Sequence, residues 1–213
     1  MMLKLVDGGA NEVMGNGSCA IPFACGVALK EWAVFVSSLE QGDQVLLLRK
    51  GGIREEGKDF RPIHPEFLLY PTYEHQRQDL LKDPYIAMLR ASLTHKPARG
   101  SVIFTHWAKV EEVIELYDEQ ALGRLDPFHI WSQDYARKRL SWKPLRPLTL
   151  MILRVYRLSN PKVVDYQPAY GGCRSWVHLE SEVSLGEVTP VLSQDAFSDV
   201  VTNIKRALDP LPI

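Results

Sequence analysis

Four short segments of this sequence combine basic, aromatic and hydrogen-bonding side chains in a pattern typical of ligand sites. The first is LLLRKGGIREEG, residues 46–57, in which three leucines lead directly to Arg49, Lys50 and a pair of glycines. Glycines let backbone N–H groups approach an anion closely, and neighbouring cationic side chains can hold it. We expect Arg49, Lys50 and Arg54 to contact phosphate. An ordinary turn is the alternative interpretation of the glycine pair.

The second segment, FLLYPTYEHQ at residues 67–76, follows an apolar strand-like run with a dense set of polar and aromatic groups. Polar side chains at the end of a buried strand are a common way to assemble a binding site. The segment has more hydrogen-bonding groups than the cap of a following helix requires, which favours a site. The residues expected to line a pocket are Tyr70, Thr72, Tyr73, Glu74 and His75.

Two further segments add basic and aromatic residues. HIWSQDYARKRLSWKPLRP, residues 129–147, has the strongest local density of positive charge, and YGGCRSWVHL, residues 170–179, again places a glycine pair before a basic residue. Aromatic faces can stack on bases while arginine and lysine contact phosphates. Packing of the tryptophans into the core is the alternative. The residues expected to extend the binding surface are Arg139, Trp142, Arg174 and Trp176.

Carboxylates near these segments raise a catalytic alternative. Asp43 followed by Glu56-Gly57-Lys58 has the D…E-x-K order of restriction-endonuclease-like sites, in which carboxylates hold Mg²⁺. The triplet lies in a polar, glycine-bounded segment and not on a core strand, so the match is weak. Catalytic residues are therefore unknown. The candidates, if the protein is an enzyme, are Glu55, Glu56, Glu74 and His75, acting with Mg²⁺ or as acid and base.

No cofactor or metal motif is evident. The patterns GxxxxGK[ST], GxGxxG and HExxH are absent, and His64-Pro65-Glu66 lacks the second half of a zinc-deaminase signature. The three cysteines are an odd number without a C-x-x-C pair, which favours reduced thiols and a cytoplasmic location. We expect no metal and no cofactor, apart from Mg²⁺ under the nuclease alternative.

Composition limits the kind of nucleic-acid site that could exist. The chain has 213 residues, of which 46% are hydrophobic, and its formal net charge is −1. A basic site must therefore be a local patch. No apolar run approaches the roughly 18 residues of a membrane span, and the N-terminus lacks a secretory signal, so we expect a protein without membrane contact. Oligomeric state is left open.

The elements that must position these segments alternate irregularly between helix and strand. Residues 1–20 are expected to form a flexible tail and residues 21–213 a single domain. Expected helices cover residues 27–41 (ended by Gly42), 79–93, 132–140 and 193–208, and residues 118–125 are expected to form a short helix or turn. Expected strands cover residues 43–50, 67–70 (stopped by Pro71), 100–116 with a bend near Ala108, 147–158 and 175–179. This order predicts a mixed α+β fold with a curved or barrel-like sheet and helices packed outside.

The motifs ALKEWA, LLLRKGGIREEG, FLLYPTYEHQ and CRSWV resemble those of an uncharacterised prokaryotic domain family known only as a domain of unknown function. Some members of that family occur beside an Mrr-type restriction endonuclease domain, which implies a role in restriction or other DNA transactions. The order of elements also resembles the PUA-like superfamily, including ASCH domains, small barrels that bind RNA or modified bases. ASCH domains usually have a lysine and a glutamate before the arginine, where leucines stand here, so no catalytic role is carried over.

The sequence thus predicts a cytoplasmic nucleic-acid-binding module with a PUA-like barrel. It would recognise single-stranded nucleic acid or a modified base, with DNA, RNA or a nucleotide as partner. The alternatives are a nuclease with the carboxylates named above and a protein-interaction scaffold with an aromatic rim.

Overall fold

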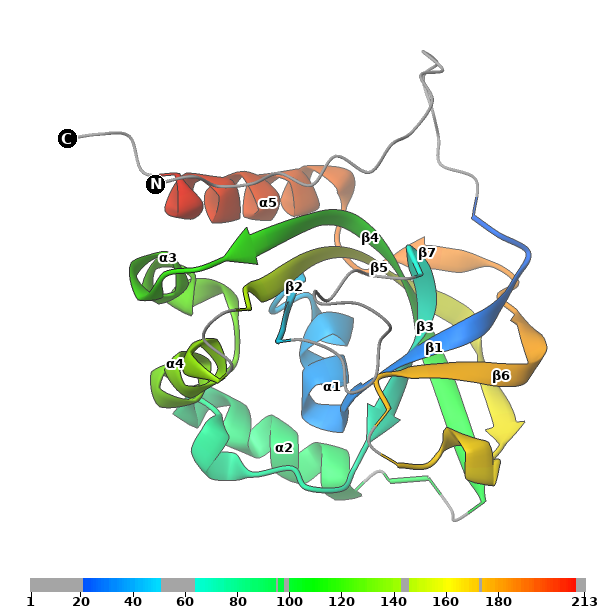
Figure 1. The fold of residues 1–213 in the computed structure, drawn as a ribbon. Coiled ribbons are helices and arrows are strands. Elements are labelled where there is room, and N and C mark those ends of the chain that lie inside the picture. The colour runs from blue at the N-terminus through cyan, green and yellow to red at the C-terminus, as the bar shows by residue number, and fades with distance from the viewer. Residues whose placement is uncertain are drawn as a thin grey trace.

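Residues 21–50, 64–94, 96–97, 100–142, 146–172 and 174–209 are described in a computed structural model of the chain (Figure 1). Their strands form one mixed sheet of seven, in the order β2-β5-β4-β3-β1-β6, with β7 paired to β5. The strands are β1 (Ala24–Trp32), β2 (Leu46–Arg49), β3 (Glu66–Thr72), β4 (Ser101–Leu116), β5 (Leu148–Asp165), β6 (Trp176–Ser184) and β7 (Val188–Pro190). The sheet is curved and not closed.

Helices lie around this sheet, which confirms the predicted α+β class with helices packed outside (Figure 1). The α-helices are α1 (Ala33–Gln41), α2 (Ile86–Thr94), α3 (Glu119–Arg124), α4 (Gln133–Ser141) and α5 (Gln194–Leu208). The 3₁₀ turns are η1 (Gln78–Leu80), η2 (Asp83–Tyr85), η3 (Asp126–Phe128) and η4 (Pro168–Tyr170). None of the helices in the described ranges is both long and apolar enough to cross a membrane.

The long antiparallel pair of β4 and β5 gives the sheet its curvature. Their register shifts between Phe104 and His106 and again between Val110 and Glu112. Each irregularity increases the local twist and bends the strand. The bend predicted near Ala108 therefore becomes two bends, one on either side of that residue, and Figure 1 shows the two strands sweeping together in an arc.

Both faces of the central strands are buried. In β1, Leu29 packs in the main core with α1 and β2, whereas the preceding Ala28 packs in a second core on the opposite face. In β3, Phe67 and Leu69 belong to the main core and Leu68 to the second. This alternation, expected for strands, decides which candidate residues can meet.

The prediction of a helix over residues 27–41 is half wrong. Its first half is the strand β1, and only residues 33–41 are helical. A central strand buried on both faces carries apolar residues at consecutive positions, and these fit a helical period by chance. The predicted stop is confirmed, because Gly42 has a φ of 76° and donates its N–H to the carbonyl of Leu39 at 3.2 Å.

Several boundaries also differ from the prediction. Strand β3 continues through Pro71, at a point where its register with β4 has ended and it pairs with β1 alone. Such an edge-like position tolerates a residue without N–H. Helix α2 begins only at Ile86, after two 3₁₀ turns, while β5 and β6 run longer than expected and β7 was not predicted. The expected tail, residues 1–20, lies outside the described residues.

A buried histidine predicts how stability depends on pH. Burial lowers the pKa of His129 from 6.5 to about 4, and the charge of Lys82 acts in the same direction. A depressed folded-state pKa gives a contribution that is complete above pH 6.5 and is lost as the pH falls toward 4. We expect roughly 2–3 kcal/mol of unfolding free energy to be lost in that window because of this group.

Urea denaturation near pH 7 and near pH 4.5 measures this loss. The variant His129→Gln should show a shallower pH dependence than the wild type, whatever its stability near pH 7. Equal slopes in the two proteins would contradict the assignment.

Candidate functional site

Residues Lys30, Glu31 and Trp32 end strand β1, and all four predicted segments make direct contacts there. Arg49 at the end of β2 lies 2.6 Å from Glu31 between Nη2 and Oε1, with side chains only 12% and 13% exposed. The same Nη2 donates to the carbonyl of Lys30 at 2.7 Å. Strands β2 and β1 are far apart in the sheet order, so Arg49 crosses the open side of the curved sheet with its side chain.

The segment that opens β6 joins the same cluster. Arg49 Nη1 donates to Ser175 Oγ at 3.4 Å, and the backbone N–H of Lys30 donates to the carbonyl of Ser175 at 2.8 Å. Trp176 pairs with Leu29 in the register of β1 and β6. Its ring lies 5.1 Å from that of Phe67 between centroids, edge to face.

The segment that ends β3 contacts β1 and the start of α1. Thr72 Oγ1 donates to the carbonyl of Glu31 at 2.9 Å, and the backbone N–H of Val34 donates to Gln76 Oε1 at 3.0 Å. Gln76 thereby caps a helix whose N-cap residue, Trp32, provides no side-chain bond. We call Glu31, Arg49, Thr72, Ser175 and Trp176 the β1-end cluster.

The basic segment of α4 reaches the cluster through a chain of aromatic rings. Trp32 lies edge-on to Trp131 with centroids 5.1 Å apart, and Trp131 lies 4.5 Å from Tyr135. Arg139 Nη1 then donates to the hydroxyl of Tyr135 at 3.2 Å. The start of α4 is set by Ser132, whose hydroxyl accepts from the backbone N–H of Tyr135, as predicted.

Four N–H donors in and around the cluster have no hydrogen-bond partner. They are shielded from solvent and come from four separate segments. The donors are Arg49 Nε, Gln76 Nε2, Arg139 Nε and Trp176 Nε1. A buried donor without an acceptor costs about 1–3 kcal/mol. These four donors are therefore unused hydrogen-bonding capacity of the described residues around the cluster.

Lys50 and Tyr70 do not lie with the other candidates. The Lys50 side chain is buried, burial lowers its pKa, and its Nζ donates to the carbonyl of Leu140 in α4 and not to solvent. Tyr70 pairs with Lys30 and so points to the second core, where burial raises its pKa to about 12. Strand alternation places it on the face opposite Glu31. Lys50 was expected to contact phosphate, and Tyr70 was expected to line the pocket. Both side chains are instead buried in structural positions.

The remaining candidates are distributed around the cluster. Trp142, at the end of α4, is 45% exposed, and Arg174 is exposed just before β6. Tyr73 lies under the ammonium of Lys96 at 5.7 Å, and burial raises its pKa. Glu74 and His75 form an exposed turn, with a φ of 61° at His75. Arg54, Glu55, Glu56 and Cys173 lie outside the described residues.

Sequence reasoning missed Glu31, Gln76 and Trp131 as parts of the site. Glu31 was read as one position of an amphipathic helix, where a carboxylate carries no signal. Gln76 and Trp131 stand within quoted segments, but their roles depend on contacts with α1 and β1. The described residues contain no group of three or more histidine, cysteine, aspartate or glutamate side chains placed to hold a metal ion.

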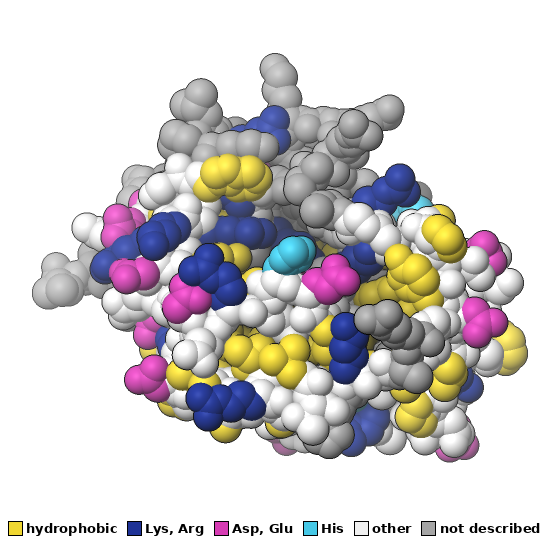
Figure 2. All heavy atoms as spheres, turned by 90° about the horizontal axis from the view of Figure 1, so that it is seen from below, with side chains coloured by type: hydrophobic (Ala, Val, Ile, Leu, Met, Phe, Trp, Pro, Cys, Tyr) yellow, Lys and Arg dark blue, Asp and Glu magenta, His cyan; other side chains and the backbone are white. Residues whose placement is uncertain are grey.

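The charge on the surface is mixed. Figure 2 shows one face, seen from below the view of Figure 1, with lysine and arginine side chains spread over it among hydrophobic ones. Acidic side chains lie mostly toward its rim. Basic residues thus form no single continuous patch among the coloured side chains of this face.

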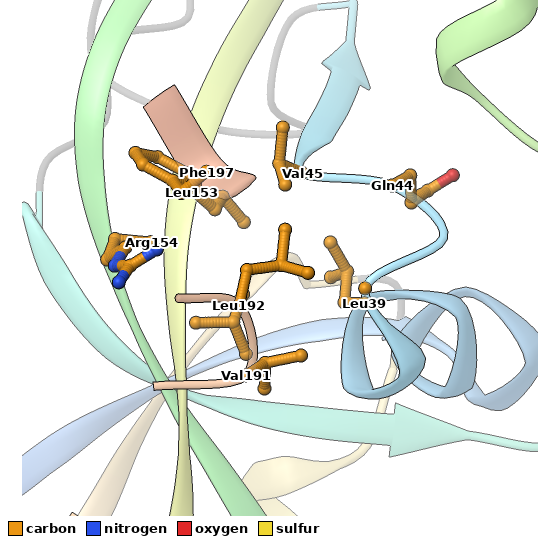
Figure 3. Close-up of a pocket in the computed structure, with 10 residues that line it drawn as sticks. Leu39, Gln44, Val45, Leu153, Arg154, Val191, Leu192 and Phe197 are labelled. Carbon is orange, nitrogen blue, oxygen red and sulfur yellow. The ribbon is translucent and has the colours of Figure 1, made fainter. Parts of the chain in front are cut away.

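A separate apolar hollow lies between α1, β5 and the start of α5 (Figure 3). Leu39, Val45 and Leu192 point toward one another there, and Arg154 lies at its side with its guanidinium 4.6 Å from the ring centre of Phe197. Arg154 Nη1 donates to the carbonyl of Ser193 at 3.3 Å. Close packing at Gly42, where an added Cβ would lie 2.7 Å from Leu192 Cδ2, makes this a packing contact of the core.

The chain belongs to the family described as "Domain of unknown function (DUF1802)", whose model matches residues 28–203. This confirms the resemblance carried by the four motifs, while the association with Mrr-type nucleases stays a prediction. No curated protein matches the chain.

One solved structure is similar, that of a mutant ZmASCH protein from Zymomonas mobilis. It shares 11% identity with a TM-score of 0.40, over 83% of this chain and 96% of that chain.

The ion pair of the β1-end cluster predicts a large effect on stability. Glu31→Gln removes one partner and leaves the Arg49 charge shielded from water, so we expect a loss of about 3 kcal/mol in the free energy of unfolding, measured by urea denaturation. The matched control is Asp79→Asn, which breaks the exposed pair of Arg77 and Asp79 and should leave stability unchanged. Equal effects of the two changes would show that Arg49 and Glu31 do not bridge the sheet.

Proposed function

We propose that this chain is a nucleic-acid-binding module that takes a single-stranded segment or an unpaired base at the β1-end cluster. The observation that carries the proposal is the convergence of unpartnered N–H donors with tryptophan rings from separate segments. Phosphate and base oxygens accept hydrogen bonds, and bases stack on aromatic rings, so one ligand class satisfies both features.

The residues divide into a structural set and a contact set. Arg49 is paired with Glu31, and its guanidinium holds the cluster together while its Nε has no hydrogen-bond partner. Arg174 and Trp142 are exposed and would contact phosphate and stack on a base, respectively. Arg139, on the same helix as Trp142, would extend the path along α4.

The finer parts of the proposal rest on sequence alone. The partner would be DNA or RNA in the cytoplasm, and the module would be accessory to restriction or other nucleic-acid processing. This follows from the resemblance to a family in which some members occur beside Mrr-type nuclease domains. The near-neutral net charge of −1 means that binding must come from the local cluster.

Fluorescence anisotropy with a labelled single-stranded oligonucleotide tests the proposal. We expect the logarithm of the affinity to fall linearly with the logarithm of salt concentration. Arg174→Gln should weaken binding by about fivefold and reduce the salt slope by about one. Trp142→Ala should weaken binding by a similar factor, because base stacking contributes about 1–3 kcal/mol.

The matched control is Arg206→Gln on α5, an exposed arginine that donates to Asn203 and not to the cluster. It should leave the affinity unchanged. Absence of binding even at low salt would overturn the proposal. Loss of the oligonucleotide in the presence of Mg²⁺, abolished by Glu74→Gln, would show the nuclease alternative instead.

A further inference from the structure

Two histidines lie beside Trp176 at the edge of the β1-end cluster. His64, just before β3, has its ring centroid 5.2 Å from that of Trp176 and 5.2 Å from that of His178, edge to face in both cases. His178 follows Trp176 by two residues on β6, so the two side chains point to the same face. The three rings therefore form one surface on two strands.

Two carboxylates, those of Glu180 and Glu182, follow His178 at steps of two residues along β6 and so share its face. Burial lowers the pKa of His64, and the positive charge of His178 lowers it further. Among the described residues no acidic group contributes to that shift, and none forms an ion pair with either histidine. The ring neighbours of His64 from β6 are Trp176 and His178. A proton gained by the pair thus adds positive charge that no ion pair among the described residues offsets.

We infer that His64 and His178 are a proton-dependent phosphate contact, so that the cluster binds nucleic acid more tightly as the pH falls below neutrality. The inference rests on the proposed function. Each imidazolium donates from both ring nitrogens and attracts the phosphate of a strand whose base stacks beside Trp176. His178 is exposed and provides the accessible end of the pair.

Protonation of the histidines and binding of phosphate are thermodynamically linked, so each must favour the other. If protonation strengthens phosphate binding, then bound phosphate must raise the pKa of the histidines by the corresponding amount. Neutral imidazoles would give weak contacts with phosphate, and charged ones would give strong contacts. The arginines in the cluster keep their charge between about pH 7.5 and pH 5.5, so they do not produce the same dependence.

The test compares oligonucleotide affinity near pH 7.5 and near pH 5.5 at constant ionic strength, by fluorescence anisotropy. The wild type should bind on the order of fivefold more tightly at the lower pH. The double variant His64→Gln with His178→Gln should bind with the same affinity at both. His178→Lys carries its charge at both values, and should bind tightly near pH 7.5 and gain less on acidification.

A second measurement separates this inference from the proposed function. NMR titration of the wild type and of His178→Gln follows the His64 ring without any ligand, and the variant should show a higher His64 pKa because a like charge is removed. No oligonucleotide binding at either pH overturns the proposed function and the inference with it. Binding with the same pH dependence in the double variant overturns the inference alone, as does an unchanged His64 pKa in His178→Gln.

Discussion

The contact between Arg49 and Glu31 is the interaction on which the rest of the structure depends. The sheet curves until its edge strand β2 faces the end of β1, but no backbone ladder closes that gap. A guanidinium has donors on several sides, and Arg49 uses them for the Glu31 carboxylate, the Lys30 carbonyl and the Ser175 hydroxyl. The Arg49 side chain thereby links β2 to the end of β1 and to the start of β6. These contacts explain why the apolar strand β2 ends in a charged residue.

The same arrangement leaves part of its hydrogen-bonding capacity unused. Arg49 donates through its terminal nitrogens while its Nε has no acceptor, and Gln76 caps α1 with its oxygen while its nitrogen has none. Buried donors of this kind reduce stability unless a ligand supplies acceptors. Sites for binding commonly carry such a cost because the groups are held in place before the ligand arrives. Recognition of a ligand, as proposed above, would account for these donors.

Local signals in the sequence predicted the parts of the fold that depend on neighbouring residues. Ser132, Ser193 and Gly42 end or begin helices as expected, because caps and left-handed glycines are decided within a few residues. Strand β1 was misread because its burial on both faces comes from β3 and β6, which lie far away in the sequence. A strand buried on both faces has no alternation of apolar and polar residues, so periodicity does not identify it as a strand.

The candidate site, like the fold, could be predicted from the sequence only in part. The segments were recognisable from their composition, but their meeting point depends on the register that pairs Trp32 with Thr72 and Lys30 with Tyr70. A shift of one residue in β3 would exchange the two faces of that strand and turn Tyr70 to the face of β1 that carries Glu31. For this reason the sequence could not show that Arg49 and Trp176 lie together while Lys50 and Tyr70 are buried elsewhere.

The central claim is that the donors around Arg49 form a preassembled site for an acceptor-rich ligand. The most direct measurement is a ¹⁵N NMR titration of the tryptophan and arginine side-chain N–H groups with a single-stranded oligonucleotide. The account predicts that the signals of Trp176 Nε1 and of Arg49 and Arg139 Nε move together as the ligand is added, while that of the buried Trp107 Nε1 does not. Movement of signals remote from the end of β1, with the Trp176 and Arg49 signals unchanged, would contradict it.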